Sequence, residues 1–332
     1  MKGINQAKIA RMAGVSPATV SRVINNSGYV SQEVRKAVED AISASGYISE
    51  SAAYSKKQRR VGLFYPGGML SPLYSHMSQY IQSIFADEDY YVIAANSPSI
   101  CNKTICYHTE KLRRIGICGL IFCGFVDDKL EDETRELLNS CGFPIIFVEG
   151  TDNCYGFDRI FIDNTYGTYQ AARCLISKGH KHLLYVSRNM KYEVARMRER
   201  GFLRAISEAK SADIKHQIKY CVTNDPHSGY IATKEAYEKD PLITGIVGWE
   251  DIVTIGIQQY VMRNLSDVFD SIEIIGHDNV LAPYYGIPVN SIDMPFREIA
   301  YSALETIKRQ VESNVEIAPR TVTLEPKLIL CQ

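Results

Sequence analysis

The sequence predicts a small helical domain at the N-terminus, followed by a large α/β core of two lobes, each a doubly wound parallel sheet. Three observations support this fold class. The chain has 332 residues, enough for two or three domains that each bury a core. Its basic residues gather near the N-terminus. Beyond residue 60, short β-rich runs alternate with helical stretches, which is typical of parallel sheets with helices on both faces.

The composition excludes several classes of protein. Hydrophobic residues make up 45% of the chain and charged residues 23%, which is ordinary for a globular protein and excludes a largely disordered chain. The nine cysteines form no C-x-x-C pair, so reduced thiols are favoured over a disulfide framework or a zinc site. No apolar run approaches the roughly 20 residues of a membrane span, and the first residues have no apolar signal core. We expect a cytoplasmic protein with no cofactor and no metal.

Charge is distributed unevenly along the chain. Residues 1–60 hold ten Lys and Arg against four Asp and Glu, a net charge of +6, whereas the whole chain carries -1 and the remainder therefore -7. A basic domain favours a polyanionic partner, because Lys and Arg that neutralise phosphates release condensed counterions. A solvated basic surface without a partner is the alternative at this point.

Three short helices are predicted in this basic domain. The first spans Gln6 to Ala13 and ends at Gly14. The second begins with Ser16 as N-cap and Pro17 as first helical residue, and it runs to about Asn25. Ser31 caps a third helix, which ends at Gly46. Their apolar residues form one small core: Ile9, Met12 and Ala13, then Val20, Val23 and Ile24, then Val34, Ala37, Val38, Ala41 and Ile42.

Two helices joined by a glycine turn, with small polar residues and an arginine on the second, are typical of a helix-turn-helix. The small side chains of Pro17 and Ala18 let the second helix lie deep in the major groove. There Ala18 would contact a thymine methyl group, and Arg22 would bond O6 and N7 of guanine. Four neighbouring side chains are suited to phosphates: Ser16, Thr19, Ser21 and Asn25. A three-helix bundle without a role on DNA is the alternative.

The run AGVSPATVSRVINNSGYVSQEVRKAVEDAISASGY resembles the DNA-binding headpiece of the LacI/GalR family of bacterial transcription regulators. The resemblance implies a headpiece over residues 1–46, in which Pro17, Ala18 and Arg22 read bases. It also implies a hinge over residues 47–60, where the family places an arginine and a leucine that wedges between base pairs in the minor groove. Here Tyr54 and Lys56 stand at those two positions. We expect Tyr54 or the aliphatic stem of Lys56 to contact DNA instead, with a disordered basic linker as the alternative.

The remainder of the chain is predicted to form repeated βα units. It contains no G-x-x-x-x-G-K-[ST] motif and no G-x-G-x-x-G after the first strand, so P-loop and dinucleotide-binding interpretations lose their main support. The predicted strands are Val61–Tyr65, Tyr91–Ala95, Gly119–Phe122, Ile145–Glu149, Ile160–Ile162, His182–Val186, Lys215–Cys221, Gly245–Gly248 and Glu273–Ile275, with a strand-like Lys327–Leu330 near the end.

These runs resemble the periplasmic-binding-protein-like core of the same family, in which the chain crosses three times between two lobes. The matching segments include FPIIFVEG, RERGFLRAI and IIGHDNVLAPYYGIPVNSIDMPF. The resemblance implies an effector-binding core over residues 61–332, with crossings near Ile162-Asp163, Asn290-Ser291 and Thr321-Val322. The first lobe would then hold residues 61–162 and 291–321, and the second lobe residues 163–290 and 322–332.

The resemblance also implies an effector cleft between the lobes. Glu149 stands where the family often has an aspartate facing the ligand, Arg198 matches the effector-binding arginine, and Asp278 matches a ligand-contacting aspartate. Glu250 replaces an asparagine that usually contacts ligand, and Trp249 is placed either to stack on a sugar ring or to pack at the end of its strand. The expected effector-binding residues are Ser71, Tyr74, Glu149, Arg196, Arg198, Trp249, Glu250 and Asp278. Salt bridges between the lobes are the alternative role of the acids and arginines.

The sequence thus predicts a ligand-responsive regulator of transcription, most simply a homodimeric repressor of a carbohydrate-utilisation operon. Its partners would be pseudo-palindromic double-stranded operator DNA and a small effector, a sugar or sugar phosphate. It is not expected to be an enzyme or to bind a membrane. The alternative is a sugar-binding protein or a cleft enzyme with a vestigial headpiece, and acid-base catalysis by Glu149, Glu250 and Asp278 is the form that such an enzyme would take.

Overall fold

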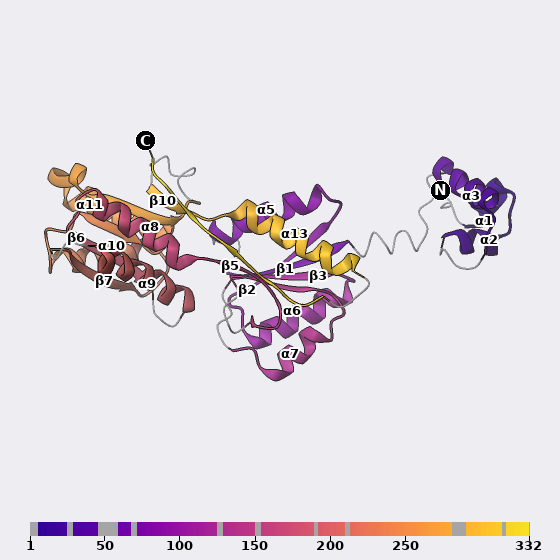
Figure 1. The fold of residues 1–332 in the computed structure, drawn as a ribbon, viewed down its shortest axis with the longest axis horizontal. Coiled ribbons are helices and arrows are strands. Elements are labelled where there is room, and N and C mark those ends of the chain that lie inside the picture. Colours follow the sequence, from indigo (N-terminus) through magenta and orange to yellow (C-terminus); the bar gives the residue numbers. More distant parts are fainter. Residues whose placement is uncertain are drawn as a thin grey trace.

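The computed structural model contains three folded parts: a helical headpiece and two α/β lobes (Figure 1). This confirms the predicted fold class. The residues that the structure describes are 6–24, 29–45, 59–67, 72–124, 129–149, 154–188, 192–209, 213–280, 290–313 and 317–331. Among these residues, no helix is both long enough and apolar enough to span a bilayer.

The headpiece contains three helices, α1 (Gln6–Ala13), α2 (Pro17–Ile24) and α3 (Gln32–Ser45). Its core is formed by Ile9, Ala10, Val20, Val23, Val38 and Ala41. The prediction was wrong for Met12, which is 47% exposed, because α1 turns Ala10 and Ile9 toward the other helices instead. Gly14 ends α1 with a φ of +65°, a left-handed conformation that glycine adopts without steric cost. That turn sets the direction in which α2 begins.

Lobe 1 is a six-stranded parallel sheet in the order β11-β5-β4-β3-β1-β2. One apolar cluster lies between the sheet and helices α5 and α13, and a second lies on the opposite face under α6 and α7. The strands are β1 (Arg60–Pro66), β2 (Tyr91–Ser97), β3 (Gly119–Cys123), β4 (Ile145–Val148), β5 (Asp158–Ile162) and β11 (Thr321–Leu324). The helices are α5 (Pro72–Ala86), α6 (Asn102–Arg114), α7 (Asp132–Asn139) and α13 (Phe296–Glu312).

Lobe 2 has the sheet order β12-β10-β9-β8-β6-β7, with only the edge strand β12 antiparallel among its described pairs. Helices α8 and α9 cover one face, and α10 and α11 cover the other. The strands are β6 (His182–Arg188), β7 (Lys215–Cys221), β8 (Gly245–Gly248), β9 (Glu273–Asp278), β10 (Asn290–Asp293) and β12 (Lys327–Ile329). The helices are α8 (Asn164–Ser177), α9 (Glu193–Glu208), α10 (Pro226–Tyr237), α11 (Asp251–Asn264) and the 3-10 helix η2 (Ser266–Ser271).

The helices of lobe 2 pack in pairs at close range because glycines stand at the contacts. A Cβ at Gly256 of α11 would overlap the Pro226 carbonyl oxygen of α10, and one at Gly201 of α9 would overlap the Thr165 carbonyl oxygen of α8. Only a residue without a side chain allows the backbones to approach this closely. These two contacts set the close spacing of α10 with α11 and of α8 with α9.

The chain passes between the lobes three times, first between β5 and α8. Two crossings lie further along the chain than the sequence predicted. Strand β10 pairs with β9 and β12, so the second crossing follows Asp293 rather than lying at Asn290-Ser291. Strand β11 pairs with β5 as far as Leu324, so the third crossing follows that residue rather than lying at Thr321-Val322. Strand β11 forms an edge of its sheet, and β10 lies between β9 and the edge strand β12.

Candidate functional site

The exposed face of helix α2 begins with a hydroxyl cap. Ser16 Oγ accepts a hydrogen bond from the Thr19 backbone N–H at 3.1 Å, which stabilises the first turn of α2. Behind this cap, Pro17, Ala18 and Arg22 are exposed, whereas Thr19 and Ser21 are partly buried. Exposed side chains on the second helix are positioned to reach a groove of DNA, so the assignment of this face stays a prediction. Asn25, Tyr54 and Lys56 lie outside the described residues.

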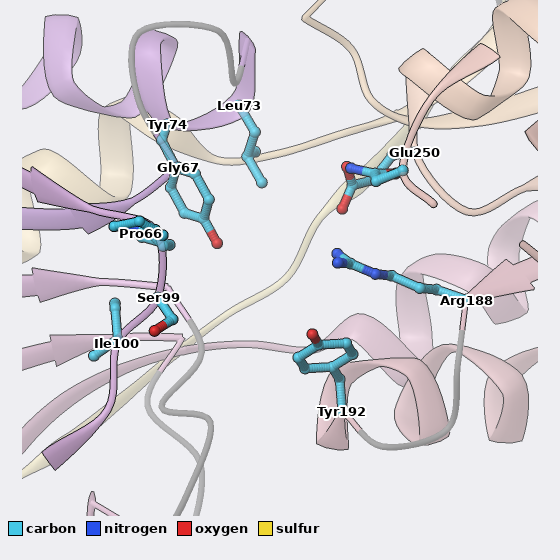
Figure 2. A pocket seen from close by; sticks show the side chains of 11 residues that line it. Pro66, Gly67, Leu73, Tyr74, Ser99, Ile100, Arg188, Tyr192 and Glu250 are labelled. Atoms are coloured by element: carbon cyan, nitrogen blue, oxygen red, sulfur yellow. The ribbon is translucent and has the colours of Figure 1, made fainter. Parts of the chain in front are cut away.

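A cavity of about 260 Å³ lies between the two lobes, at the carboxyl ends of their parallel strands. This is the position in which open α/β sheets bind ligands. Figure 2 shows side chains from both lobes facing one another across it. Its lining residues are Pro66, Gly67, Leu73, Tyr74, Pro98, Ser99 and Ile100 of lobe 1, and Arg188, Tyr192, Asn224 and Glu250 of lobe 2.

Tyr74 brings a hydroxyl group into the cavity from the first turn of α5 (Figure 2). A Cβ at Gly124 would lie 2.7 Å from the Tyr74 hydroxyl oxygen, so the glycine at the end of β3 leaves room for the ring. Burial, with the negative charges of Glu149 and Glu250, raises the pKa of Tyr74 well above its usual value. The hydroxyl is therefore protonated and available as a donor.

Arg188, the last residue of β6, extends into the cavity from lobe 2 (Figure 2). Its guanidinium carbon lies 4.7 Å from the centre of the Tyr192 ring, a cation–π distance. Glu250 lies on the same side of the cavity, and its Oε2 accepts a hydrogen bond from Asn224 Nδ2 at 2.6 Å. Burial raises the pKa of Glu250 to about 7, and the charge of Asp278 adds to the rise.

A buried cluster of hydrogen-bonded residues centred on Arg198 connects α8, α9 and the ends of β8 and β9 in lobe 2. The Arg198 guanidinium donates to Asn164 Oδ1 at 2.8 Å, to the Trp249 carbonyl oxygen at 2.5 Å and to Asp278 Oδ1 at 3.5 Å. The same carboxylate oxygen of Asp278 lies 2.9 Å from His277 Nδ1. Burial raises the pKa of Asp278 to about 6, while Arg198 opposes that rise. Each of the three nitrogens of this guanidinium thus donates to a protein acceptor.

Glu149 stands directly after β4 and is 2% exposed. Neither carboxylate oxygen has a hydrogen-bond partner among the described residues. Burial raises its pKa to about 7, against the opposing charge of Arg198. Its backbone φ is +58°, and that of Asp278 is +98°, a left-handed region that is strained for residues other than glycine. Such strain clusters at functional sites.

The structure brings five of the eight predicted effector residues to the cavity or close to it. Tyr74 and Glu250 line the cavity, and Glu149, Arg198 and Asp278 form the buried groups whose charges act on it. Ser71 lies outside the described residues. The predictions for Trp249 and Arg196 were wrong.

Trp249 does not offer a face to the cleft. It is 1% exposed, belongs to the apolar cluster under α10 and α11, and lies against Arg198, whose guanidinium carbon is 4.4 Å from its ring centre. Arg196 is partly exposed and pairs with Glu193, its Nε donating to Glu193 Oε2 at 3.1 Å. Arg196 does not line the cavity. Arg196 and Arg198 are two positions apart on α9, so their side chains point in nearly opposite directions, and Arg198 is the one that is buried.

Sequence reasoning missed Arg188, Tyr192 and Asn224. Arg188 lies two residues beyond the predicted strand His182–Val186 and ends the observed β6, so the rule that ligands bind at carboxyl ends of parallel strands was a usable signal for it. Tyr192 and Asn224 stand just before helices α9 and α10 and carry no such signal.

Two family descriptions match this chain. Residues 7–50 match "Bacterial regulatory proteins, lacI family", and residues 172–330 match "Periplasmic binding protein-like domain". The two matches fall on the headpiece and on the core, in the order in which the family combines them. The chain belongs to the LacI/GalR family. The resemblance inferred from the headpiece motif is thereby confirmed.

Curated relatives match nearly the whole chain. An HTH-type transcriptional repressor PurR from Mannheimia succiniciproducens is 25% identical over 97% of this chain and 96% of its own. A ribose operon repressor from Haemophilus influenzae is 26% identical over the same shares. Among solved structures, the lac repressor dimer bound to operator and the anti-inducer ONPF has a TM-score of 0.73 at 20% identity, covering 99% of this chain and 98% of that one. A complex of the regulator CelR with cellobiose has a TM-score of 0.67 at 19% identity, covering 99% of both chains. The family fold therefore extends through headpiece and core.

Proposed function

We propose that this family member is an effector-controlled repressor of a carbohydrate-utilisation operon, which acts in the cytoplasm as a homodimer on a pseudo-palindromic operator. The observation that supports this most is the cavity between the lobes, lined by polar side chains of both, in a chain that also carries a helix-turn-helix headpiece. We assign residues 1–46 to the headpiece, 47–60 to the hinge and 61–332 to the core. The lobe boundaries follow the observed crossings.

The proposed mechanism is a shift between two arrangements of the lobes. A ligand that contacts Tyr74 on lobe 1 and Glu250 on lobe 2 binds best when the lobes are close together, so it stabilises that arrangement. Two headpieces on a dimer would respond through their spacing, and affinity for the operator would change by the differential affinity of the ligand for the two arrangements. Pro17, Ala18 and Arg22 would read bases, while Ser16, Thr19 and Ser21 would contact phosphates.

A sugar or sugar phosphate is the effector that the site supports best. Hydroxyl groups both donate and accept, which suits the Tyr74 hydroxyl, the unpartnered carboxylate of Glu149 and the Glu250–Asn224 pair. One relative is named a ribose operon repressor and one structural neighbour holds cellobiose, whereas another relative is named PurR. The cavity has no described metal cluster beside it, and the described residues include no group of three or more His, Cys, Asp or Glu that could hold a metal ion.

Selection of bound duplexes from a randomised DNA pool tests the proposal. The full-length protein is incubated at fixed salt, with and without members of a panel of sugars, sugar phosphates and purines. We expect a palindromic motif whose enrichment changes with one sugar or sugar phosphate. Binding that is independent of sequence and only sensitive to salt would reject the repressor function, and a response confined to purines would reject the carbohydrate effector.

A cleft enzyme is the rival function, because burial raises the pKa of both Glu250, which lines the cavity, and Glu149, which is buried near it, to about 7. Incubation of the bound sugar with the protein, followed by chromatography, separates the two. Recovery of unchanged sugar is expected of a repressor, and steady conversion would establish an enzyme.

A further inference from the structure

We infer that the effector of this cleft carries an anionic group, a phosphate or a carboxylate, and that Arg188 binds it. The inference rests on the proposed function of the cleft as the effector site, and it narrows the effector to acidic or phosphorylated sugars.

Arg188 is a partly buried arginine of lobe 2 without a carboxylate partner among the described residues, whereas Arg173 and Arg263, which have no such partner either, are exposed. Arg198, which the family resemblance assigned to the effector, already donates to Asn164, Trp249 and Asp278. Arg196 and Arg200 pair with Glu193 on the surface of α9. Arg188 has no carboxylate within salt-bridge distance among the described residues, and the contact that the structure gives it is the Tyr192 ring.

The position of Arg188 makes this unpaired charge significant. Its side chain is half-buried and, in Figure 2, its guanidinium group points into the space between the lobes and toward the Tyr74 hydroxyl. A cation that is partly removed from water is stabilised by an anion brought to it. The fork of N–H groups on a guanidinium matches the oxygens of a phosphate or carboxylate, which it binds in a bidentate manner.

Glu250 is the nearest candidate for an internal counter-ion, and two observations show why it does not fill that role. Its Oε2 already accepts a short hydrogen bond from Asn224. Burial raises its pKa to about 7, although the charges of Arg198 and Arg188 oppose that rise. A raised pKa makes it easier for Glu250, and likewise for Glu149, to take up a proton when an anion arrives, which limits the repulsion between them.

Further donors surround the place where the anion would lie. The Tyr74 hydroxyl is held protonated by its raised pKa, and the Tyr192 hydroxyl faces the same space in Figure 2. Ser99 lines the cavity from lobe 1. An oxyanion bound to Arg188 would therefore meet groups of both lobes. The volume of about 260 Å³ suits a monosaccharide derivative better than a long oligosaccharide.

Titration calorimetry on the full-length protein tests the inference. The ligands are matched sets: a neutral monosaccharide, its phosphate ester and its sugar acid, with inorganic phosphate as the anion alone. The proteins are wild type, Arg188→Met, Arg188→Lys and Arg200→Met, the last removing an exposed arginine of the same lobe. Circular dichroism checks that each variant folds.

We expect one anionic member of a set to bind wild type at least about tenfold more tightly than its neutral parent. Arg188→Met is expected to reduce that affinity about 10–100-fold, the effect of losing hydrogen bonds between charged groups, while the parent sugar binds as before. Arg188→Lys should retain part of the preference, and Arg200→Met all of it. Whether the ester or the acid is preferred identifies the anion.

Three results would overturn the inference. Tighter binding of a neutral sugar than of its anionic derivatives, unchanged in Arg188→Met, would refute the anion site while leaving the effector cleft intact. Failure of every sugar and derivative to bind would refute the carbohydrate effector and, with it, this inference. An equal loss of affinity for neutral and anionic ligands in Arg188→Met would show that the arginine only shapes the cavity.

Discussion

The carboxyl group of Glu149 should make the stability of lobe 1 depend on pH. In the folded protein its pKa is raised from 4.5 to about 7, because the group is buried without a hydrogen-bond partner among the described residues. Between these two values the folded state holds a proton that the unfolded state has released. Stability contributed by this group is therefore lost as pH rises from about 4.5 to 7, and it stays low above pH 7. Replacing Glu149 by Gln removes the titration.

The size of the effect follows from the shift. Each pKa unit corresponds to about 1.4 kcal/mol, so a shift from 4.5 to about 7 amounts to roughly 3 kcal/mol in total. About 2–3 kcal/mol of this is lost between roughly pH 5 and 8. A buried Gln amide without a partner has a cost of its own, about 1–3 kcal/mol, but that cost does not change with pH. The quantity to compare is therefore the pH dependence rather than the stability at one pH.

Urea unfolding, followed by circular dichroism at several pH values from 5 to 8, measures this quantity. The free energy of unfolding of Glu149→Gln, relative to wild type, should rise by about 2–3 kcal/mol across the range. Glu136→Gln, which removes an exposed carboxylate from α7 in the same lobe, serves as the control and should show little change. The charges of Asp278 and Glu250 raise the pKa of Glu149, so the pH dependence that Glu149→Gln removes includes its interaction with these two carboxyl groups.

A constant difference between Glu149→Gln and wild type from pH 5 to 8 would refute the reasoning. It would mean that the carboxylate has a partner in solution, or is hydrated, and is ionised throughout the range. A difference of the opposite sign would mean that the charge of Arg198 dominates over burial and lowers the pKa of Glu149.

Three further variants test other parts of the structure. Arg22→Ala should weaken binding to the selected operator by about 1–3 kcal/mol at fixed salt, as measured by fluorescence anisotropy. Its thermal stability should equal that of wild type, because the Arg22 side chain is exposed. An equal loss of affinity for random DNA would assign Arg22 to phosphates instead. Arg198→Met should destabilise the core by about 3–5 kcal/mol in urea, since Asp278 is left buried without its partner, and a neutral result would show that the cluster contributes little. Gly256→Ala should lower the free energy of unfolding by about 1–3 kcal/mol, because the new Cβ overlaps the Pro226 carbonyl oxygen. The control Ser207→Ala, at an exposed helical site, should change the free energy of unfolding by less than about 0.5 kcal/mol. Equal effects of the two variants would contradict the close helix packing.

The sequence predicted the strands of both sheets well because buried parallel strands are nearly continuous apolar runs. Gly119–Cys123 and Ile145–Val148, for example, are buried throughout. It missed β10 and β11, because each has only four residues, β10 with a single apolar side chain and β11 with alternating polarity, and both lie at or beside an edge. The misplaced lobe crossings follow directly from these two strands. Edge strands are set by pairing between distant segments, which no local pattern reveals.

The candidate site was predicted in part for similar reasons. Glu149, Arg198 and Asp278 came from the family resemblance, and the structure brings them together. Spacing alone did not distinguish Arg196 from Arg198, since the rotation of α9 decides which one points inward. Arg188 was missed because its importance lies in what it lacks, a counter-ion, and that depends on the positions of residues far away in the sequence.

The paths of the last segments have a consequence for biosynthesis. Lobe 1 receives helix α13 and strand β11 from residues 296–324, and lobe 2 receives strands β10 and β12 from residues 290–329. The sheet of lobe 1 has all of its described strands only after residue 324 has been translated, and the sheet of lobe 2 only after residue 329. Until α13 is translated, the face of the lobe 1 sheet that α13 covers remains exposed to solvent. The headpiece, by contrast, folds from local contacts alone. Nascent chains of this protein should therefore depend on chaperones until release, and the headpiece should acquire its fold well before the core does.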